Sequence, residues 1–153
     1  MDPLKRTSGG LVLLVVTVMF FMKQPSQVFG FPILQKVDVI IVNELGFPKA
    51  PLTLHCRSKD DDLGVHVLHY QQTFRWTFRN HLWEDTVFWC DFQWNSEPRV
   101  RYHASVTIYG MHVSHRCSRY CNWKIRRVGL FLVDDYAYGQ LVPMYIWPVP
   151  HRS

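Results

Sequence analysis

Strict alternation of aromatic and polar side chains in residues 73–79 (TFRWTFR) narrows the possible folds of this chain more than any other stretch. Side chains of a β-strand point alternately to the two faces of a sheet, so Phe74, Trp76 and Phe78 share one face. Short strands separated by turns predict an all-β fold, a small antiparallel β-sandwich of about seven to eight strands. The other stretches expected to form strands are residues 37–43, 52–58, 65–68, 86–94, 100–109, 123–133 and 144–147.

The chain is long enough for one domain with a packed core. It has 153 residues, of which 48% are hydrophobic and 15% aromatic. This composition argues against disorder, and the length argues for a single domain.

Residues 11–22 (LVLLVVTVMFFM) form an unbroken apolar run after a short basic head. A polar stretch follows and ends in the small residue Gly30. A membrane-spanning helix needs about 20 apolar residues, and a buried amphipathic helix would be apolar on one face only. The pattern therefore predicts a signal peptide at residues 1–30, a secreted domain at residues 31–153 and no stable insertion into a membrane.

The charge of the chain excludes one class of partner. The formal net charge is +5, and the predicted signal peptide contributes three cations and one carboxylate to it. The secreted domain is therefore only mildly basic, whereas phosphate binding needs a dense basic patch. We predict no nucleic-acid partner, and an acidic partner at the cell surface or cell wall is compatible with this charge.

Four cysteines, Cys56, Cys90, Cys117 and Cys121, remain in the predicted domain. An even number of cysteines in a short secreted chain predicts two disulfides, with three possible pairings. We favour the pairing of each of Cys117 and Cys121 with one of Cys56 and Cys90, since such bonds would connect distant strands, although the sequence leaves all three open.

Three adjacent carboxylates, Asp60, Asp61 and Asp62, precede a glycine in the stretch HCRSKDDDLG. Neighbouring side chains on an extended segment point apart, and a calcium loop spaces its ligands at alternate positions and ends in a distant glutamate. Aspartate side chains bond nearby backbone amides, and glycine permits positive φ. A turn is the favoured interpretation, with a metal site and a partner-contacting loop as alternatives.

The spacing of His112, His115, Cys117 and Cys121 has the residue types of a zinc site. Oxidation of thiols outside the cell argues against zinc, and Cys56 and Cys90 would then have no other evident role. We expect disulfides with exposed histidines, and we predict no metal and no cofactor.

Catalytic motifs are weak in this sequence. Residues 80–84 (NHLWE) loosely resemble the His-Gly-Leu-Trp-Pro block of secreted plant ribonucleases of the T2 type, but the glycine and the proline are missing. General acid–base cleavage needs a second group beyond His81, and no serine lies in a Gly-x-Ser-x-Gly context. We predict that the protein is not an enzyme.

A basic cluster lies in the C-terminal half, interleaved with Tyr120 and Trp123. It could contact an acidic partner, and a solvated strand edge guarded by charge is the commoner reason for such a cluster. Its members are Arg116, Arg119, Lys124, Arg126 and Arg127.

Several blocks occur in an order that resembles a known family. The blocks are VDVIIVN at residues 37–43, HCRSKDDDLG at 55–64, TFRWTFR at 73–79, TVFWCDFQW at 86–94 and CSRYCNW at 117–123. Together they resemble the plant self-incompatibility protein family, which includes the poppy-type S-protein homologues. The resemblance implies a small secreted β-sandwich with two intramolecular disulfides and no known active site, and the founding members are stigma-borne ligands that cause rejection of self pollen.

The resemblance and the lack of catalytic motifs predict a secreted extracellular signalling ligand that is monomeric and binds a cell-surface receptor or another protein. Pollen–stigma or other cell–cell recognition is the role that the resemblance implies for it. A secreted defence protein or ribonuclease-like enzyme is the alternative, and a carbohydrate-binding module is a weaker one. Contact loops are expected at residues 60–64, 80–85, 95–99 and 110–120, the last of which is rich in His and Arg where relatives are more acidic. The candidate contact residues are Asp60, Asp61, Asp62, His81, His112, His115, Arg116 and Arg119.

Overall fold

The structure of the protein is a computed structural model that describes residues 35–46, 49–80, 86–97, 100–148 and 151–152. This part of the chain contains ten β-strands, a four-residue helix and one short 3-10 turn. The predicted signal peptide at residues 1–30 and the predicted contact residue His81 lie outside it, so both stay predictions. No helix among the described residues combines the length and the apolar character needed to cross a membrane.

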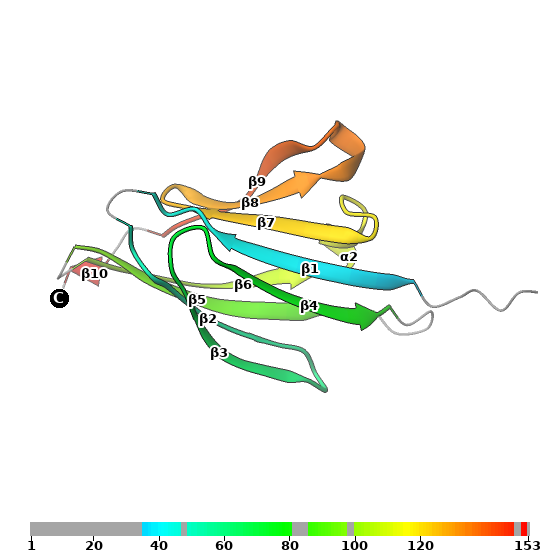
Figure 1. The fold of residues 1–153 in the computed structure, drawn as a ribbon, viewed down its shortest axis with the longest axis horizontal. Helices are drawn as coiled ribbons and strands as arrows, with labels where there is room; N and C mark the ends of the chain where they lie inside the picture. Colours follow the sequence, from blue (N-terminus) through cyan, green and yellow to red (C-terminus); the bar gives the residue numbers. More distant parts are fainter. Residues whose placement is uncertain (1–34, 47–48, 81–85, 98–99, 149–150, 153) are drawn as a thin grey trace, which may run out of the picture. The chain divides into compact units, whose positions relative to one another are not determined.

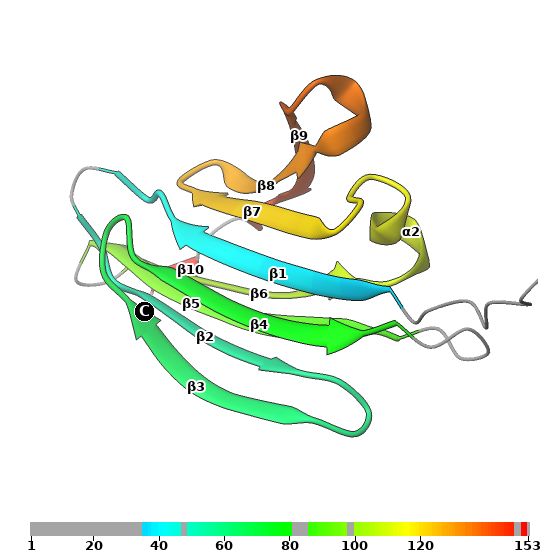
Figure 2. The same cartoon turned by 45° about the vertical axis from the view of Figure 1, so that its right-hand side comes forward.

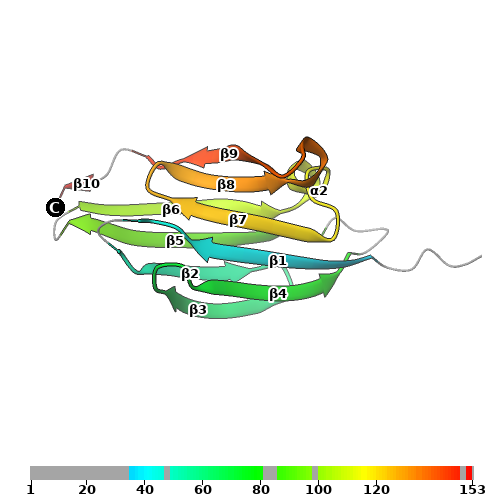
Figure 3. The same ribbon diagram turned by 45° about the horizontal axis from the view of Figure 1, so that its top comes forward.

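The strands form two five-stranded sheets that face each other, as Figures 1 and 3 show. In spatial order, the first sheet consists of β4 (Thr73–Arg79), β1 (Lys36–Asn43), β7 (Tyr120–Arg126), β8 (Gly129–Asp134) and β9 (Gln140–Ile146). The second sheet consists of β10 (His151–Arg152), β6 (Val100–Tyr109), β5 (Phe88–Glu97), β2 (Leu52–Arg57) and β3 (Asp62–Leu68). The predicted β-sandwich is confirmed.

Two details of the strand arrangement differ from the sequence prediction. The pair β1–β7 is parallel, with Val39 opposite Cys121, whereas every other strand pair is antiparallel. Parallel neighbours need a long connection, and here the chain builds most of the second sheet between β1 and β7. Residues 123–133, expected as one strand, form the hairpin of β7 and β8, because the chain reverses at Arg127–Val128.

The core lies between the sheets and follows from the period-two pattern of each strand. In β5, Phe88, Cys90, Phe92 and Trp94 are buried while the residues between them are more exposed. Trp123 of β7 is fully buried, and its indole Nε1 donates a hydrogen bond to the carbonyl oxygen of Ile108 at 3.1 Å. Buried aromatic side chains from both sheets therefore hold the sandwich together.

The two predicted disulfides are confirmed, but the favoured pairing is wrong. Cys56 of β2 and Cys90 of β5 lie directly opposite each other, with Cα atoms 4.0 Å apart, and are bonded. Cys117 is bonded to Cys121, with Cα atoms 5.1 Å apart. The expected pairings fail because Cys56 and Cys90 both belong to the second sheet, where strand register already makes them neighbours, while Cys121 belongs to the first.

Candidate functional site

Two of the predicted contact loops, residues 60–64 and 110–120, lie at one end of the sandwich, while residues 81–85 of the predicted loop 80–85 lie outside the described residues. This end contains the β2–β3 turn, the end of β4, the start of β5 and the helix α2 (Met111–Ser114), as Figures 1 and 2 show. Val87 lines one cavity with the β2–β3 turn and another with α2, so these segments are neighbours. Of the predicted loop at residues 95–99, the described residues 95–97 belong to the end of β5, at the opposite end of the sandwich. The sequence could not show this separation.

Residues 110–120 are attached to the core at two points. The side chain of Val113 is 3% exposed and packs in the core. The disulfide between Cys117 and Cys121 then closes the segment onto the start of β7, with both cysteines buried. A disulfide across so short a loop restricts the conformations of the residues between the cysteines. Consequently, the segment presents its outer side chains on a fixed backbone.

A third attachment is electrostatic and involves Asp134, at the end of β8. The Arg116 guanidinium donates to the Asp134 carboxylate at 2.9 Å, and the same carboxylate accepts the backbone N–H groups of Tyr136 and Ala137 at the 3-10 turn η1 (Asp135–Ala137). Burial raises the pKa of Asp134, but the hydrogen bonds from Arg116 and these two amides outweigh it, so the pKa lies below its usual value. The Asp134 carboxylate is therefore charged at neutral pH.

Asp135 adds a further contact to the same segment. Its carboxylate accepts the Ser118 hydroxyl at 2.8 Å and the Ser118 backbone N–H at 3.0 Å. The backbone N–H of Asp135 donates to the Arg116 carbonyl oxygen at 3.0 Å. Residues 116–118 are thus held against η1 by bonds in both directions.

The outward side of residues 110–120 is basic and partly apolar. Met111 is 64% exposed, and His112 on the helix and His115 directly after it are also exposed. Arg119 is exposed and lies over the ring of Tyr120, with its guanidinium carbon 5.4 Å from the ring centroid. Exposed cations and a large apolar side chain on a rigid segment suit contact with another molecule.

The aspartate run forms a turn, in agreement with the sequence interpretation, but a serine organises it. The Ser58 hydroxyl accepts the backbone N–H groups of Asp60 and Asp61 at 3.3 and 3.0 Å, and the Ser58 N–H donates to the Asp61 carbonyl oxygen at 2.8 Å. Asp60 and Asp61 are exposed. Their carboxylates are thus available at the surface.

Asp62 has a different role from its two neighbours, because it begins β3. Its carboxylate accepts the backbone N–H of Gly64 at 2.9 Å and contacts His55 Nε2 at 2.6 Å. The Gly64 hydrogen bond, followed by the His55 contact, holds the pKa of Asp62 below its usual value. Gly64 adopts φ +77°, a conformation that glycine accepts at no steric cost. Asp62 therefore shapes the start of the strand.

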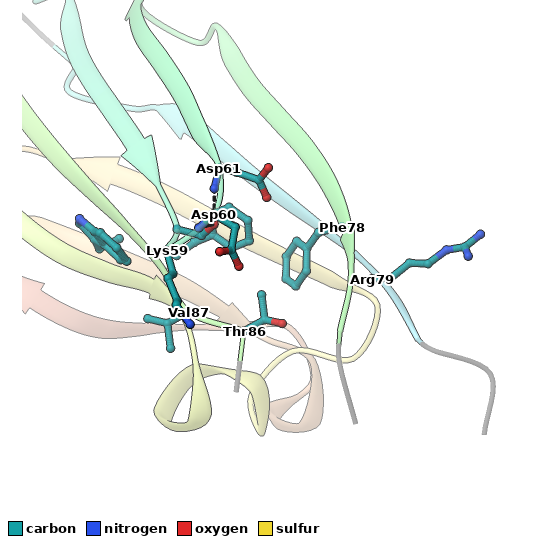
Figure 4. A pocket seen from close by; sticks show the side chains of 10 residues that line it. Lys59, Asp60, Asp61, Phe78, Arg79, Thr86 and Val87 are labelled. Atoms are coloured by element: carbon teal, nitrogen blue, oxygen red, sulfur yellow. Dashed lines mark hydrogen bonds between the residues drawn. The ribbon is translucent and has the colours of Figure 1, made fainter. Parts of the chain in front are cut away.

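A cavity of about 330 Å³ lies between the aspartate turn, the end of β4 and the start of β5. Figure 4 shows Phe78 pointing into it and Arg79 pointing away, with Asp60 and Thr86 both to the left of the Phe78 ring. Carboxylates at its mouth and aromatic walls make it a shallow mixed pocket for a side chain of another molecule.

A second, more apolar cavity of about 420 Å³ adjoins α2. Val106 of β6, Met144 of β9 and the helix residues Met111 and Val113 line it. It lies beside β6 and the edge strand β9, and its apolar lining extends the contact surface of residues 110–120.

Of the predicted contact residues, His112, His115 and Arg119 lie exposed on one segment, and Asp60 and Asp61 lie exposed on the turn. Arg116 is half-buried in its ion pair with Asp134, so it supports the segment more than it offers a contact. Sequence reasoning missed Ser58, Asp134 and Asp135, which organise these loops. The sequence held a signal for Ser58, because a serine before two polar residues is typical of a turn. It held none for Asp134 and Asp135, because their partners come from a segment about 18 residues away.

The described residues bear on the zinc alternative that the sequence left open. No group of three or more His, Cys, Asp or Glu residues in the described ranges could hold a metal ion. All four cysteines are in disulfides. Because Cys117 and Cys121 are bonded to each other, neither has a thiol left to bind zinc, and the zinc alternative is excluded for this pair. The exposed histidines beside this disulfide are as expected.

Comparison with known proteins gives a consistent result. The family model described as plant self-incompatibility protein S1 matches residues 38–147. S-protein homolog 5 of Arabidopsis thaliana is 35% identical over 116 residues, which cover 75% of this chain and 85% of that protein. Self-incompatibility protein S1 of Papaver rhoeas is 30% identical over 137 residues, which cover 90% of this chain and 88% of that protein.

A solved structure has the same fold. It matches with a TM-score of 0.52 and 18% identity, over 78% of this chain and 97% of the other. It represents the self-incompatibility protein homologues, described as small, highly stable, secreted proteins from plants. At this sequence identity the match shows a common fold and nothing about function.

Proposed function

Because the chain belongs to the plant self-incompatibility protein S1 family, we propose that it is a secreted extracellular recognition ligand, without enzymatic activity, that binds a protein partner at a cell surface. The predicted signal peptide at residues 1–30 would direct its secretion. A role in pollen–stigma or other cell–cell recognition would follow from binding to the partner.

One observation carries this proposal, namely the way in which residues 110–120 are held. Val113, the Cys117–Cys121 disulfide and the Arg116–Asp134 pair fix the backbone, while Met111, His112 and His115 remain exposed. Rigid loops on a β-sandwich lose little entropy on binding, which favours recognition. We therefore place the principal contact surface at residues 110–120, with the aspartate turn at residues 60–64 beside it.

The test is binding of the labelled secreted protein to intact cells of its source plant. Replacement of both exposed histidines (H112E/H115E) adds two negative charges to the contact surface without touching the disulfide or the Arg116–Asp134 pair. We expect saturable binding of the unmodified protein and a loss of about tenfold or more in affinity for the variant, since like charge in an interface costs several kcal/mol.

A matched control carries the same kind of change at the opposite end of the sandwich. The variant H69E/V128E alters the exposed His69 and Val128, which lie in the turns after β3 and β7. It should bind as the unmodified protein does. If H112E/H115E binds as tightly as the unmodified protein and has the same thermal midpoint, the proposed contact surface is rejected. If heat-unfolded protein shows the same saturable binding to the cells, the proposed function is rejected.

A further inference from the structure

The basic residues of β7 do not guard a strand edge. The sheet order places β7 between β1 and β8, so it is a central strand with hydrogen-bonded neighbours on both sides. Charged residues commonly protect exposed edges from pairing with other chains, and that reason does not apply here. Because Trp123 and Ile125 face the core, Lys124 and Arg126 face outward from the first sheet. Their presence on this face therefore needs another explanation.

One group of cations surrounds a buried carboxylate at the start of β1. Asp38 is 2% exposed, and its carboxylate lies 2.9 Å from Arg75 and 3.9 Å from Arg119. It also accepts the Thr77 hydroxyl. The hydrogen bonds from Thr77 and then Arg75 hold the pKa of Asp38 below its usual value, so one negative charge faces two arginines. Lys36, two residues away on the same face, adds a third cation.

A second group repeats this imbalance beyond the other end of β1. The carboxylate of Glu44 lies 3.0 Å from the Lys124 ammonium and 2.9 Å from the Arg126 guanidinium. Burial raises the pKa of Glu44, but the hydrogen bonds from Lys124 and Arg126 outweigh it and the pKa is lowered. Each carboxylate thus holds its cations in place while neutralising only part of their charge.

An apolar strip separates the two groups. The strand registers place Ile40 between Arg75 and Asn122, and Val42 between Thr73 and Lys124. Phe131 lies opposite Lys124 on β8, and Val133 follows on the same face. These four apolar side chains are half-buried, with no described segment covering this face of the sheet. Asp38 and Glu44 are six residues apart, which is about 20 Å along a strand.

We infer that this outer face of the first sheet docks an acidic polypeptide segment of the partner, with carboxylates about 20 Å apart and apolar side chains between them. The inference rests on the proposed function and specifies the chemistry of the partner. Carboxylates of the segment complement the excess cations of the two groups, and its apolar side chains cover Ile40 and Val42.

The face suits a polypeptide better than an acidic cell-wall polysaccharide. Sugars bind proteins largely by stacking on open aromatic rings, and two aromatic side chains lie on this face. The Arg126 guanidinium lies over Phe131 at 5.5 Å, as that of Arg119 does over Tyr120 at 5.4 Å. Both rings already carry a cation, so stacking would displace it. The half-buried aliphatic strip instead matches apolar side chains.

The test uses a synthetic peptide with two glutamates at each end and four alternating leucine and serine residues between them. In an extended peptide, this spacing places the two pairs of carboxylates about 20 Å apart and the leucines on one face. At low salt we expect saturable binding to the secreted protein, with amide chemical-shift changes at Ile40, Val42 and Asn122. Higher ionic strength should weaken it, because exposed charges are screened.

Two matched variants decide whether the face or the net charge is responsible. In K36Q/K124Q, Asp38 and Glu44 each keep an arginine partner, so the fold is expected to survive, and the affinity should fall about tenfold. K49Q/K59Q removes the same charge from exposed loops of other segments and should leave the affinity unchanged. Equal losses in both variants, or shift changes outside this face, would overturn the inference. Tighter binding of an oligogalacturonate at the same residues would also overturn it.

Failure of this inference and failure of the proposed function give different results. If the peptide does not bind but H112E/H115E still abolishes cell-surface binding, the ligand function stands and the acidic partner segment is rejected. If no cell-surface binding occurs at all while the peptide binds as expected, the proposed function is rejected and the basic face remains a binding surface.

Discussion

The two disulfides should stabilise the protein to different extents, because they close loops of different length. The bond between Cys56 and Cys90 spans 34 residues, and the bond between Cys117 and Cys121 spans four. Loop-closure entropy of the unfolded chain then gives about 4 kcal/mol for the first and about 2 kcal/mol for the second at 25 °C. Both alanine double variants should fold, and C56A/C90A should be the less stable.

Chemical unfolding measures this difference directly. With a guanidinium m-value of about 4 kcal/mol/M, the midpoint should fall by about 1 M in C56A/C90A and about 0.5 M in C117A/C121A. Intrinsic tryptophan fluorescence reports the transition, since Trp94 and Trp123 are buried. Only C117A/C121A should also lose cell-surface binding, because its disulfide fixes the proposed contact segment.

Two results would refute this reasoning. If C117A/C121A were the less stable variant, loop length would not govern the contributions of the bonds. If a peptide map under oxidising conditions linked Cys56 or Cys90 to Cys117 or Cys121, the closed loops would be different and the calculation would not apply.

Further predictions concern strand pairing and acid stability. A Cβ on Gly129 would lie 2.1 Å from the Tyr145 carbonyl oxygen, so Gly129→Ala should separate β8 from β9 and destabilise the fold by about 3 kcal/mol, as judged by chemical unfolding. Gly139→Ala, with φ +75° and open space around it, should cost only about 1 kcal/mol. The lowered pKa of Asp134 means that its contribution is present above its unfolded pKa of about 4 and is lost as the pH falls through the folded value. Thermal midpoints between pH 7 and pH 2 should therefore decrease in acid, and they should decrease less in D134N, whereas D60N should behave as the unmodified protein.

The sequence located most of the strands because their side chains obey a local rule, although the last stretch, expected at residues 144–147, is β9 at Gln140–Ile146, and β10 was not expected. Alternation located residues 73–79 as a strand with no error at either end, and residues 52–58 with an error of one residue. Each of these strands turns one face toward the opposite sheet, so the pattern is visible without knowledge of the partner strand. Only the half-burial of Phe74, Trp76 and Phe78 was not evident, and it follows from the position of β4 at the edge of its sheet.

Pairing between distant strands was beyond the sequence because no local pattern encodes it. Cys56 meets Cys90 only through the register of β2 and β5, and Val39 meets Cys121 only through the parallel pair. The same limitation applies to the loops. The exposure of His112 and His115 was expected. The ion pair that half-buries Arg116, however, depends on Asp134, 18 residues further along the chain.

The parallel pair also explains why one residue belongs to both proposed surfaces. The Asp38 N–H donates to the Arg119 carbonyl oxygen at 2.8 Å, which fixes Arg119 at the junction between the contact segment and the outer face of the first sheet. Its guanidinium reaches Asp38 on that face, while the disulfide between Cys117 and Cys121, two residues before and two residues after it, anchors the segment. A substitution of Arg119 would therefore weaken both surfaces at once. Changes that avoid Arg119 separate the two surfaces. Those at His112 and His115 test recognition by the end loops, and those at Lys36 and Lys124 test binding by the sheet face.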